Sequence, residues 1–331
     1  MSRIPRRKFL VSAGALIAAP LQGFAQPAAA MPRIGFLGAA NPTAWAPRLD
    51  AFRAGLRDLG YVEGRNIAIE YRFAEGQYDR LPALAAELVR LKVDVIVTHA
   101  AVGALAAKQA TASNPIPVVI TNVGDAVGSG IVASLARPGG NITGDTFFAP
   151  ELAAKRLEVL KDAIPQVRRV AVLVNPDSPG TAPQLQAMES TVKALNVTLV
   201  RFDMRGPADL DGAFAAMSEK KVDAVAVNEG DINIIASVKS IAEHVARLRL
   251  PSIGFIEFVD AGGLFCYGVN FLALYRRAPV FVDKILRGAK PADIPVERPT
   301  SFEFVINMKT AKALGLAVSS ATRLRADRVI D

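Results

Sequence analysis

Short apolar runs alternate with amphipathic stretches along most of the chain, and this alternation predicts the elements of the fold. Each run is rich in Val and Ile, is short enough for one strand and is apolar on both faces. This pattern is typical of parallel strands that helices cover on both sides. The runs are Ile34–Gly38, Asp94–Thr98, Pro117–Thr121, Val170–Val174, Thr198–Phe202, Asp223–Val227 and Pro251–Phe255.

Between the runs, apolar residues recur at steps of three and four, which predicts helices with one buried face. Such helices are predicted over 47–60, 79–92 and 235–248. Pro47 is expected in the first turn of its helix, and Gly60 supplies a stop at the end. Alternating strands and helices predict an α/β fold with parallel sheets.

The strand–helix series restarts near residue 147, and the chain is long for one doubly wound sheet. We therefore expect two similar lobes with a cleft between them. Ligands of open α/β sheets bind beyond the carboxyl ends of the strands, and clefts between domains are favoured pockets. The strand-end loops around this cleft are the places to look for a site.

The first 30 residues have a different pattern, which predicts a signal peptide over 1–30. Arg6 and Arg7 belong to a basic start, an apolar run follows, and small residues offer cleavage after Ala25 or Ala30. The stretch RRKFL resembles the twin-arginine export pattern, with Sec export as the alternative. We expect a periplasmic protein. Because the segment holds four basic and no acidic residues, its removal lowers the formal net charge from +8 to +4.

A net charge of this size, without a cluster of Lys and Arg, excludes nucleic acid as an expected partner. The only cysteine, Cys266, excludes an intrachain disulfide and a cysteine-based zinc site. No metal site or cofactor is expected, because the two His residues lack partner ligands and the glycines match no phosphate loop. No enzyme is expected, since neither G-x-S-x-G nor HExxH occurs.

Several long motifs carry a resemblance that covers nearly the whole mature chain. The chain resembles ABC-transporter substrate-binding proteins of the TrpX-like type. The matching motifs are LRDLGYVEGRNIAIEYRFAEG (56–76), LARPGGNITG (135–144), VARLRLPSI (245–253), GGLFCYG (262–268), ILRGAKPADIPVERPT (285–300) and INMKTAKALGL (306–316). The loops NPTAWAP (41–47), Asp125-Ala126 and Val227–Ile234 depart from the family pattern, so the ligand cannot be carried over.

The resemblance implies the periplasmic binding protein type I fold, with two Rossmann-like lobes, parallel sheets and a three-segment hinge. It places lobe 1 over 31–146 plus 271–296 and lobe 2 over 147–270 plus 297–331. It implies a monomer that captures a small molecule by hinge closure and delivers it to an ABC permease in the inner membrane. The alternative is an exported ligand-sensing receptor that signals through a membrane partner.

Polar and aromatic residues at strand ends and crossings are the candidate ligand contacts. Each has a structural alternative: Trp45 could pack on its lobe, His99 could be structural, Asp125 could cap a helix, and aromatics at crossings often pack a hinge. The candidates are Asn41, Trp45, Thr98, His99, Asp125, Phe147, Asn175, Asn228, Asp231, Phe255, Tyr267 and Asn270.

The expected ligand is an amino acid or an aromatic or small carboxylate. Helix N-termini in the strand-end loops would hold a carboxylate. Asp125 or Asp231 would pair with an ammonium group, which an amino acid has and an aromatic carboxylate lacks. The sequence leaves both ligand classes open.

Overall fold

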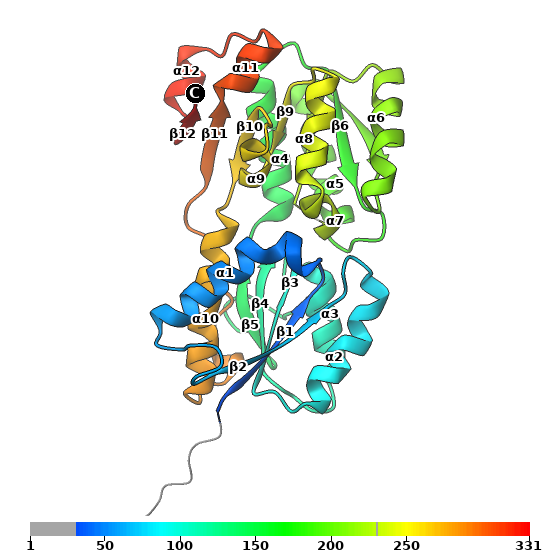
Figure 1. Ribbon diagram of the computed structural model, residues 1–331. Helices are drawn as coiled ribbons and strands as arrows, with labels where there is room; N and C mark the ends of the chain where they lie inside the picture. Colours follow the sequence, from blue (N-terminus) through cyan, green and yellow to red (C-terminus); the bar gives the residue numbers. More distant parts are fainter. Residues whose placement is uncertain (1–30, 230) are drawn as a thin grey trace, which may run out of the picture. The chain divides into compact units, whose positions relative to one another are not determined.

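The structure, a computed structural model, describes residues 31–229 and 231–331. The predicted signal peptide therefore lies outside the described residues. Residues Pro32–Asp331 form one compact unit, and this unit contains two sheets (Figure 1). None of the helices in the described ranges is long and apolar enough to cross a membrane.

The first lobe is built on a sheet of order β2-β1-β3-β4-β5, in which every neighbouring pair is parallel. Helices α1 and α10 pack together on one side of it, while α2 and α3 pack together on the other (Figure 1). The strands are β1 (Arg33–Gly38), β2 (Ala68–Phe73), β3 (Val95–His99), β4 (Val118–Val123) and β5 (Ile142–Thr146). The helices are α1 (Pro42–Asp58), η1 (Tyr78–Arg80), α2 (Leu81–Arg90), α3 (Ala100–Ala110), α10 (Phe271–Leu286) and η3 (Pro291–Asp293).

The second lobe is built on a sheet of order β12-β11-β10-β9-β8-β6-β7. Its strands are β6 (Arg169–Val174), β7 (Thr198–Asp203), β8 (Ala224–Ala226), β9 (Ser252–Gly254), β10 (Phe265–Gly268), β11 (Glu303–Asn307) and β12 (Arg328–Ile330). Its helices are α4 (Ala149–Ala163), α5 (Thr181–Leu195), η2 (Pro207–Asp209), α6 (Leu210–Glu219), α7 (Ile232–Ala236), α8 (Val238–Arg247), α9 (Ile256–Asp260), α11 (Met308–Leu314) and α12 (Ser320–Leu324).

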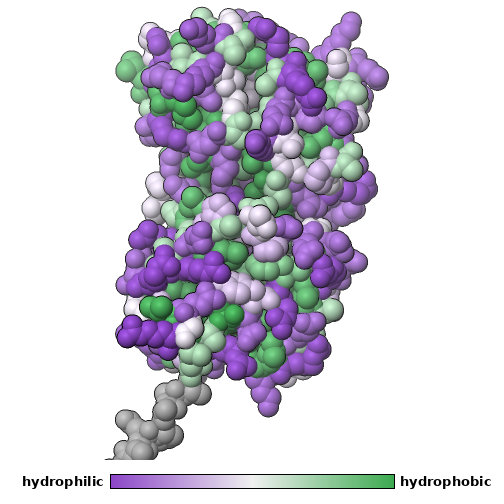
Figure 2. Space-filling model, viewed as in Figure 1, coloured by the Kyte–Doolittle hydropathy of each residue, from purple (hydrophilic) through white to green (hydrophobic). Residues whose placement is uncertain are grey.

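Both sheets bury their apolar strands beneath helices, as the sequence pattern predicts. Phe36 and Val97 of the first sheet, and Val172 and Ile253 of the second, are completely buried. Each such side chain contributes about 1.5–3 kcal/mol when it leaves water. Hydrophilic residues predominate on the surface seen in Figure 2, with apolar residues scattered among them.

Four details of the expected fold are wrong. The second sheet is not wholly parallel, because β11 returns through the long α10 connection and pairs antiparallel with β10. The run Thr198–Phe202 forms edge strand β7, whose side chains are mostly half-buried or exposed. Pro47 lies inside α1 rather than in its first turn, because Asn41 caps the helix and α1 begins at Pro42, five residues before Pro47. The helix expected over 235–248 breaks at Ser237 into α7 and α8.

The chain crosses between the lobes three times, and the crossings pack side by side. The first leads from β5 through Phe147 to α4, the second from β10 to α10, and the third from Glu297 to β11. The amide N–H of Thr146 donates to the Glu297 carbonyl over 3.0 Å, and the Glu297 N–H donates to the Gly144 carbonyl over 2.9 Å. These bonds join the first and third crossings into one short parallel bridge.

Candidate functional site

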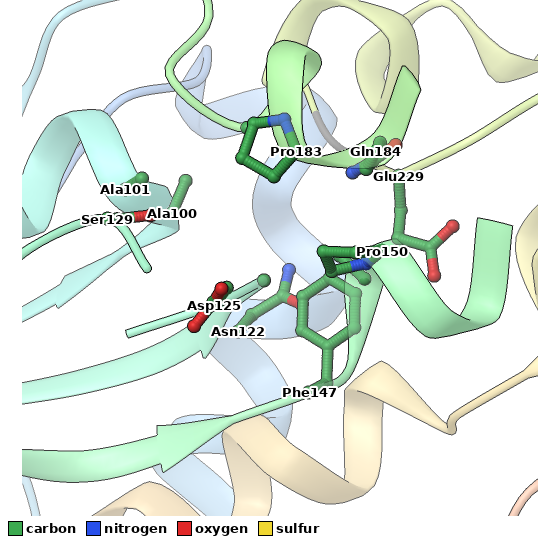
Figure 3. A pocket seen from close by; sticks show the side chains of 13 residues that line it. Ala100, Ala101, Asn122, Asp125, Ser129, Phe147, Pro150, Pro183, Gln184 and Glu229 are labelled. Atoms are coloured by element: carbon green, nitrogen blue, oxygen red, sulfur yellow. The ribbon is translucent and has the colours of Figure 1, made fainter. Parts of the chain in front are cut away.

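A small pocket lies between the two lobes, where strand ends and helix N-termini of both lobes meet (Figure 3). Its cavity volume is about 30 Å³, which is room for water rather than for an amino acid. The lining residues are Ala100, Ala101, Asn122, Gly124, Asp125, Ser129, Phe147, Ala149, Pro150, Gly180, Pro183, Gln184 and Glu229.

The wall from the first lobe contains two strained backbone positions. Ala100 has φ 57° and Asn122 has φ 52°, a left-handed conformation that is uncommon for residues other than glycine. Ala100 follows β3, Asn122 lies near the carboxyl end of the neighbouring parallel strand β4, and both line the pocket. Such strain costs of order 1–3 kcal/mol and concentrates at ligand sites, which supports a binding role for this edge of the sheet.

Two hydrogen-bond acceptors on this wall face the pocket. The Asn122 side chain is buried and its Oδ1 has no hydrogen-bond partner. In Asp125, Oδ1 accepts from the N–H groups of Val127 (3.1 Å) and Gly128 (2.8 Å), which fixes the carboxylate at the start of a turn. An amide oxygen and a carboxylate close together suit the ammonium group of a ligand.

Three helices begin at the pocket, and none of them has a side-chain hydrogen bond that caps its N-terminus. Ala100 and Ala101 open α3, Ala149 and Pro150 open α4, and Gly180 precedes α5. Uncapped first turns leave amide N–H groups without intrahelical partners, and the helix dipole favours negative charge there. The arrangement suits a carboxylate group.

The wall from the second lobe contains a buried ion pair. Arg156 of α4 and Glu229 have side chains that are 0% and 1% exposed. The Arg156 Nη2 donates to Glu229 Oε1 over 2.7 Å, and its Nη1 donates to Oε2 and to Asn228 Oδ1 (3.2 Å). Its Nε donates to the carbonyl of Tyr267, so the crossing strand β10 is tied to the same guanidinium. Glu229 is thereby fixed at the pocket wall.

Behind the first-lobe wall, Trp45 and His99 form a buried aromatic layer rather than an exposed one. Their rings stack with centroids 4.7 Å apart, and Trp45 Nε1 donates to Tyr275 Oη over 3.0 Å. His99 Nε2 accepts from the Ala39 N–H over 3.1 Å, so Nδ1 carries the proton of the neutral ring. Burial, helped by the Arg48 charge, lowers the pKa of His99 to about 3, so the ring is uncharged at neutral pH.

Asp231 makes contact across the lobes. Its Oδ1 accepts from the N–H groups of Asn233 (2.8 Å) and Ile234 (3.3 Å) at the start of α7. Its Oδ2 accepts from Asn175 Nδ2 (3.0 Å) and from Tyr78 Oη of the first lobe (2.6 Å). A carboxylate offers about four acceptor sites, so in this conformation Asp231 has none left for a ligand ammonium.

The structure brings two of the sequence candidates, Asp125 and Phe147, to the pocket itself. The others do not line it. Asn41 caps α1, Thr98 donates to the Leu37 carbonyl, and Phe255 is completely buried. Asn270 caps α10, and Tyr267 stacks on Phe302 beside the crossings. Ligand contact stays a prediction for all of the candidates.

Sequence reasoning missed the pocket residues Asn122, Gln184 and Glu229. Asn122 stands inside an apolar strand, and only the structure reveals the irregular β4–β5 register that turns it inward. Glu229 lies in the loop Val227–Ile234, which departs from the family pattern. Its ion-pair partner Arg156 is too distant in sequence for the pattern to reveal the pair. Within the described residues, no group of His, Cys, Asp and Glu could hold a metal ion.

A comparison with protein families identifies the chain. The sequence profile described as ABC transporter substrate binding protein matches residues 44–330. The chain belongs to this family. The family and the fold class expected from the sequence motifs are thus confirmed, and the two α/β lobes of this substrate-binding protein have the type I periplasmic-binding-protein fold.

Named relatives add to this assignment. A tyrosine-binding protein of Clostridioides difficile is 28% identical over 284 residues, which cover 84% of this chain and 81% of that protein. A conserved domain protein of Vibrio cholerae superposes with a TM-score of 0.83 at 25% identity, covering 90% of this chain and 99% of that one. An ABC domain of Streptococcus pneumoniae in complex with L-Trp superposes with a TM-score of 0.82 at 24% identity and the same coverage.

Proposed function

We propose that the protein is the exported receptor of an ABC importer, and that it captures an α-amino acid in the cleft between its lobes. The observation that carries this proposal is the polarity of the pocket. Uncapped helix N-termini on both lobes suit a carboxylate, while Asp125 and Asn122 Oδ1 suit an ammonium group. A zwitterion uses both sides at once.

The relatives support the same ligand class. The tyrosine-binding protein from Clostridioides difficile and the domain complexed with L-Trp are each described with an aromatic amino acid. Phe147 stands between the two walls of the pocket, beside Asn122 and Pro150 (Figure 3), and offers an aromatic face to such a side chain.

Capture requires the two lobes to move about the three crossings. A solute binds one wall in the open form and then contacts both walls when the lobes close, which is the hinge closure that periplasmic binding proteins illustrate. The ligand shifts the equilibrium only by its difference in affinity between the two forms. The closed form is then the one that an inner-membrane permease recognises. We propose that this sequence of opening, capture and closure takes place in the periplasm.

A matched set of probes tests the ligand class. We expect L-tyrosine, L-tryptophan or L-leucine to raise the melting temperature of the mature protein, because a ligand of the native state stabilises it. Tyramine lacks the carboxylate and 3-(4-hydroxyphenyl)propionate lacks the ammonium group, so both should bind at least ten-fold more weakly than L-tyrosine, as measured by calorimetry. Equal binding of tyramine and L-tyrosine would overturn the carboxylate assignment.

A substitution tests the ammonium side. Asp125→Asn keeps the oxygen that caps the turn and removes the negative charge. We expect amino-acid affinity to fall about ten-fold or more, because hydrogen bonds to charged groups contribute about 1.5–3 kcal/mol. Asp94→Asn is the matched control, since Asp94 also accepts a backbone N–H, from Arg33, but lies away from the pocket. Unchanged affinity in Asp125→Asn would exclude this carboxylate as the ammonium partner.

A further inference from the structure

Two polar contacts join the lobes outside the ligand pocket. Tyr78 Oη of η1 donates to Asp231 Oδ2 at the start of α7 over 2.6 Å. Arg48 Nη2 of α1 donates to Glu257 Oε1 of α9 over 2.6 Å. None of these four residues lines the pocket between the walls. The contacts therefore join lobe to lobe directly and need no ligand between them.

The second lobe holds the Asp231 carboxylate in a fixed orientation for its contact with Tyr78. Asp231 is 3% exposed, and three donors of its own lobe orient the carboxylate: the N–H groups of Asn233 and Ile234 and the amide of Asn175. Tyr78 is the one donor from the other lobe among its hydrogen-bond partners in the described residues. The fourth acceptor site is thus left for a group that arrives only when the lobes close.

The Gly76 backbone and the Asn233 side chain also approach closely beside this contact. A Cβ atom placed on Gly76 of the first lobe would lie 2.7 Å from Asn233 Oδ1 of the second lobe. Asn233 is held by its own lobe, because its Nδ2 donates to the Arg205 carbonyl over 2.7 Å. The hydrogen bond therefore lies beside a close-packed, partly buried edge, and a hydrogen bond to a carboxylate is stronger than one between neutral groups.

The structure assigns Tyr78 and Asp231 to an interlobe latch, which favours the closed form without touching the ligand, with Arg48 and Glu257 as a second, weaker contact. Tyr78 is a positioning residue in this assignment. Asp231 acts on the lobes rather than on the ammonium group of the solute. The assignment rests on the proposed function, because closure matters only for a protein that captures a solute.

The latch has a defined effect on ligand affinity. If the closed form is populated without ligand, the apparent dissociation constant contains that population as a factor. Loss of the Tyr78 hydroxyl should lower the closure equilibrium about ten-fold or more, given the strength of hydrogen bonds to charged groups. The change should appear as faster ligand release with little change in the association rate, because the open form that meets the ligand is unaltered.

The closure equilibrium can be measured on the ligand-free mature protein. Spin labels at Gln109→Cys in α3 and Glu219→Cys in α6 report the distance between the lobes (Figure 1), because both positions are exposed and their helices belong to different lobes. The native Cys266 is buried and does not compete for the label. We expect a short-distance population in the ligand-free protein and a ten-fold or greater loss of it in Tyr78→Phe.

Tyr61→Phe is the matched control. Tyr61 Oη donates to Asp283 Oδ1 over 2.9 Å, so the same tyrosine–aspartate bond is removed, but both residues belong to the first lobe. This variant should keep the native distance distribution. A ligand-free protein with no short-distance population, or equal distributions in Tyr78→Phe and Tyr61→Phe, would overturn the latch.

Stopped-flow measurements with L-tyrosine as the probe test the predicted change in the ligand release rate. Tyr78→Phe should release it about ten-fold faster than the native protein and Tyr61→Phe at the native rate. If L-tyrosine and the other amino-acid probes do not bind the native protein, the proposed function fails while the distance measurement still decides the latch. If Tyr78→Phe slows association instead of speeding release, Tyr78 contacts the ligand and the positioning role is wrong.

Discussion

Two arginine–glutamate pairs lie near the cleft, and they are built differently. Arg156 and Glu229 belong to one lobe, are almost fully buried, and satisfy both carboxylate oxygens, with further bonds from the guanidinium to Asn228 and Tyr267. Arg48 and Glu257 belong to different lobes and share a single bond, while Arg48 Nε and Glu257 Oε2 are buried without partners.

The difference separates a fixed element from a reversible one. A buried pair with all bonds satisfied keeps its geometry, because breaking it leaves an unpaired charge in a low dielectric. A pair that leaves polar atoms unsatisfied gives up less when it separates, since both groups regain water in the open form. We infer that Arg156–Glu229 holds the second-lobe wall in place through the cycle and that Arg48–Glu257 forms and breaks within it.

The largest expected effect comes from breaking the satisfied pair. Glu229→Gln leaves the Arg156 charge buried without its partner, which typically costs about 3–5 kcal/mol of unfolding free energy. Urea denaturation of the ligand-free protein measures this loss. A double variant, Arg156→Met with Glu229→Met, should recover most of it, because apolar residues of similar volume replace a buried pair at little cost. A loss below about 1 kcal/mol in Glu229→Gln would remove the distinction between the two pairs.

Asp145 differs from both pairs, because it is a buried carboxylate without an ion-pair partner among the described residues. Asp145, at the first crossing, is 1% exposed; Oδ1 accepts from the Asn122 N–H and Oδ2 has no partner. Burial raises its pKa from the ordinary value of 3.8 to about 7, although the Asn122 N–H, Thr121 and Arg277 lower it. The folded state therefore binds more protons than the unfolded state between about pH 4 and pH 7.

It follows that the Asp145 contribution to stability falls as the pH rises through this window. The slope is at most about 1.4 kcal/mol per pH unit, because one proton is involved. Asp145→Asn keeps an acceptor for the Asn122 N–H and cannot ionise. The unfolding free energy of this variant should therefore increase relative to that of the native protein as the pH rises from 4 to 7. The difference between the two curves cancels other titrating groups. Parallel curves would contradict the raised pKa.

The alternating pattern of the sequence predicted the strands and most helices because helix and strand periods depend on local apolar spacing. Local spacing could not predict the antiparallel β10–β11 pair, which depends on the return of the chain through α10. Local spacing also could not predict which carboxylates near the cleft have acceptor sites left for a ligand. Asp125 and Asp231 both follow strands. Tyr78, which is far away in sequence, donates a hydrogen bond to Asp231 and not to Asp125.

The aromatic candidates illustrate the same limit. Trp45 follows a strand end, as a cleft residue would, but the helix that contains it starts earlier than Pro47 and turns its ring toward His99 and Tyr275. The restart of the strand–helix series predicted the two lobes, and the family motifs supplied the three crossings, which spacing could not. The position of each side chain within the cleft depends on contacts between segments, and these appear only in the folded chain.

The smallest expected effect comes from breaking the interlobe pair. Glu257→Gln should change the unfolding free energy by about 1 kcal/mol or less, since the glutamine oxygen can still accept the single Arg48 bond and 25% of the Glu257 side chain is exposed to water. It should still alter Trp45 emission intensity in the ligand-free protein, because the Arg48 guanidinium lies 4.3 Å from the indole centroid and loses its anchor. Trp45 is the only tryptophan, so the signal is unambiguous.

Glu63→Gln provides the control for this last measurement. It breaks the 3.0 Å bond between Arg53 and Glu63, which lies inside the first lobe and is more exposed than the Arg48–Glu257 pair, so Trp45 emission should not change. A Glu257→Gln variant with native emission, or one that loses as much stability as Glu229→Gln, would show that Arg48–Glu257 is a fixed pair. In that case the lobes would be held by the same kind of contact that holds each lobe together, and opening would cost far more than a half-satisfied pair implies.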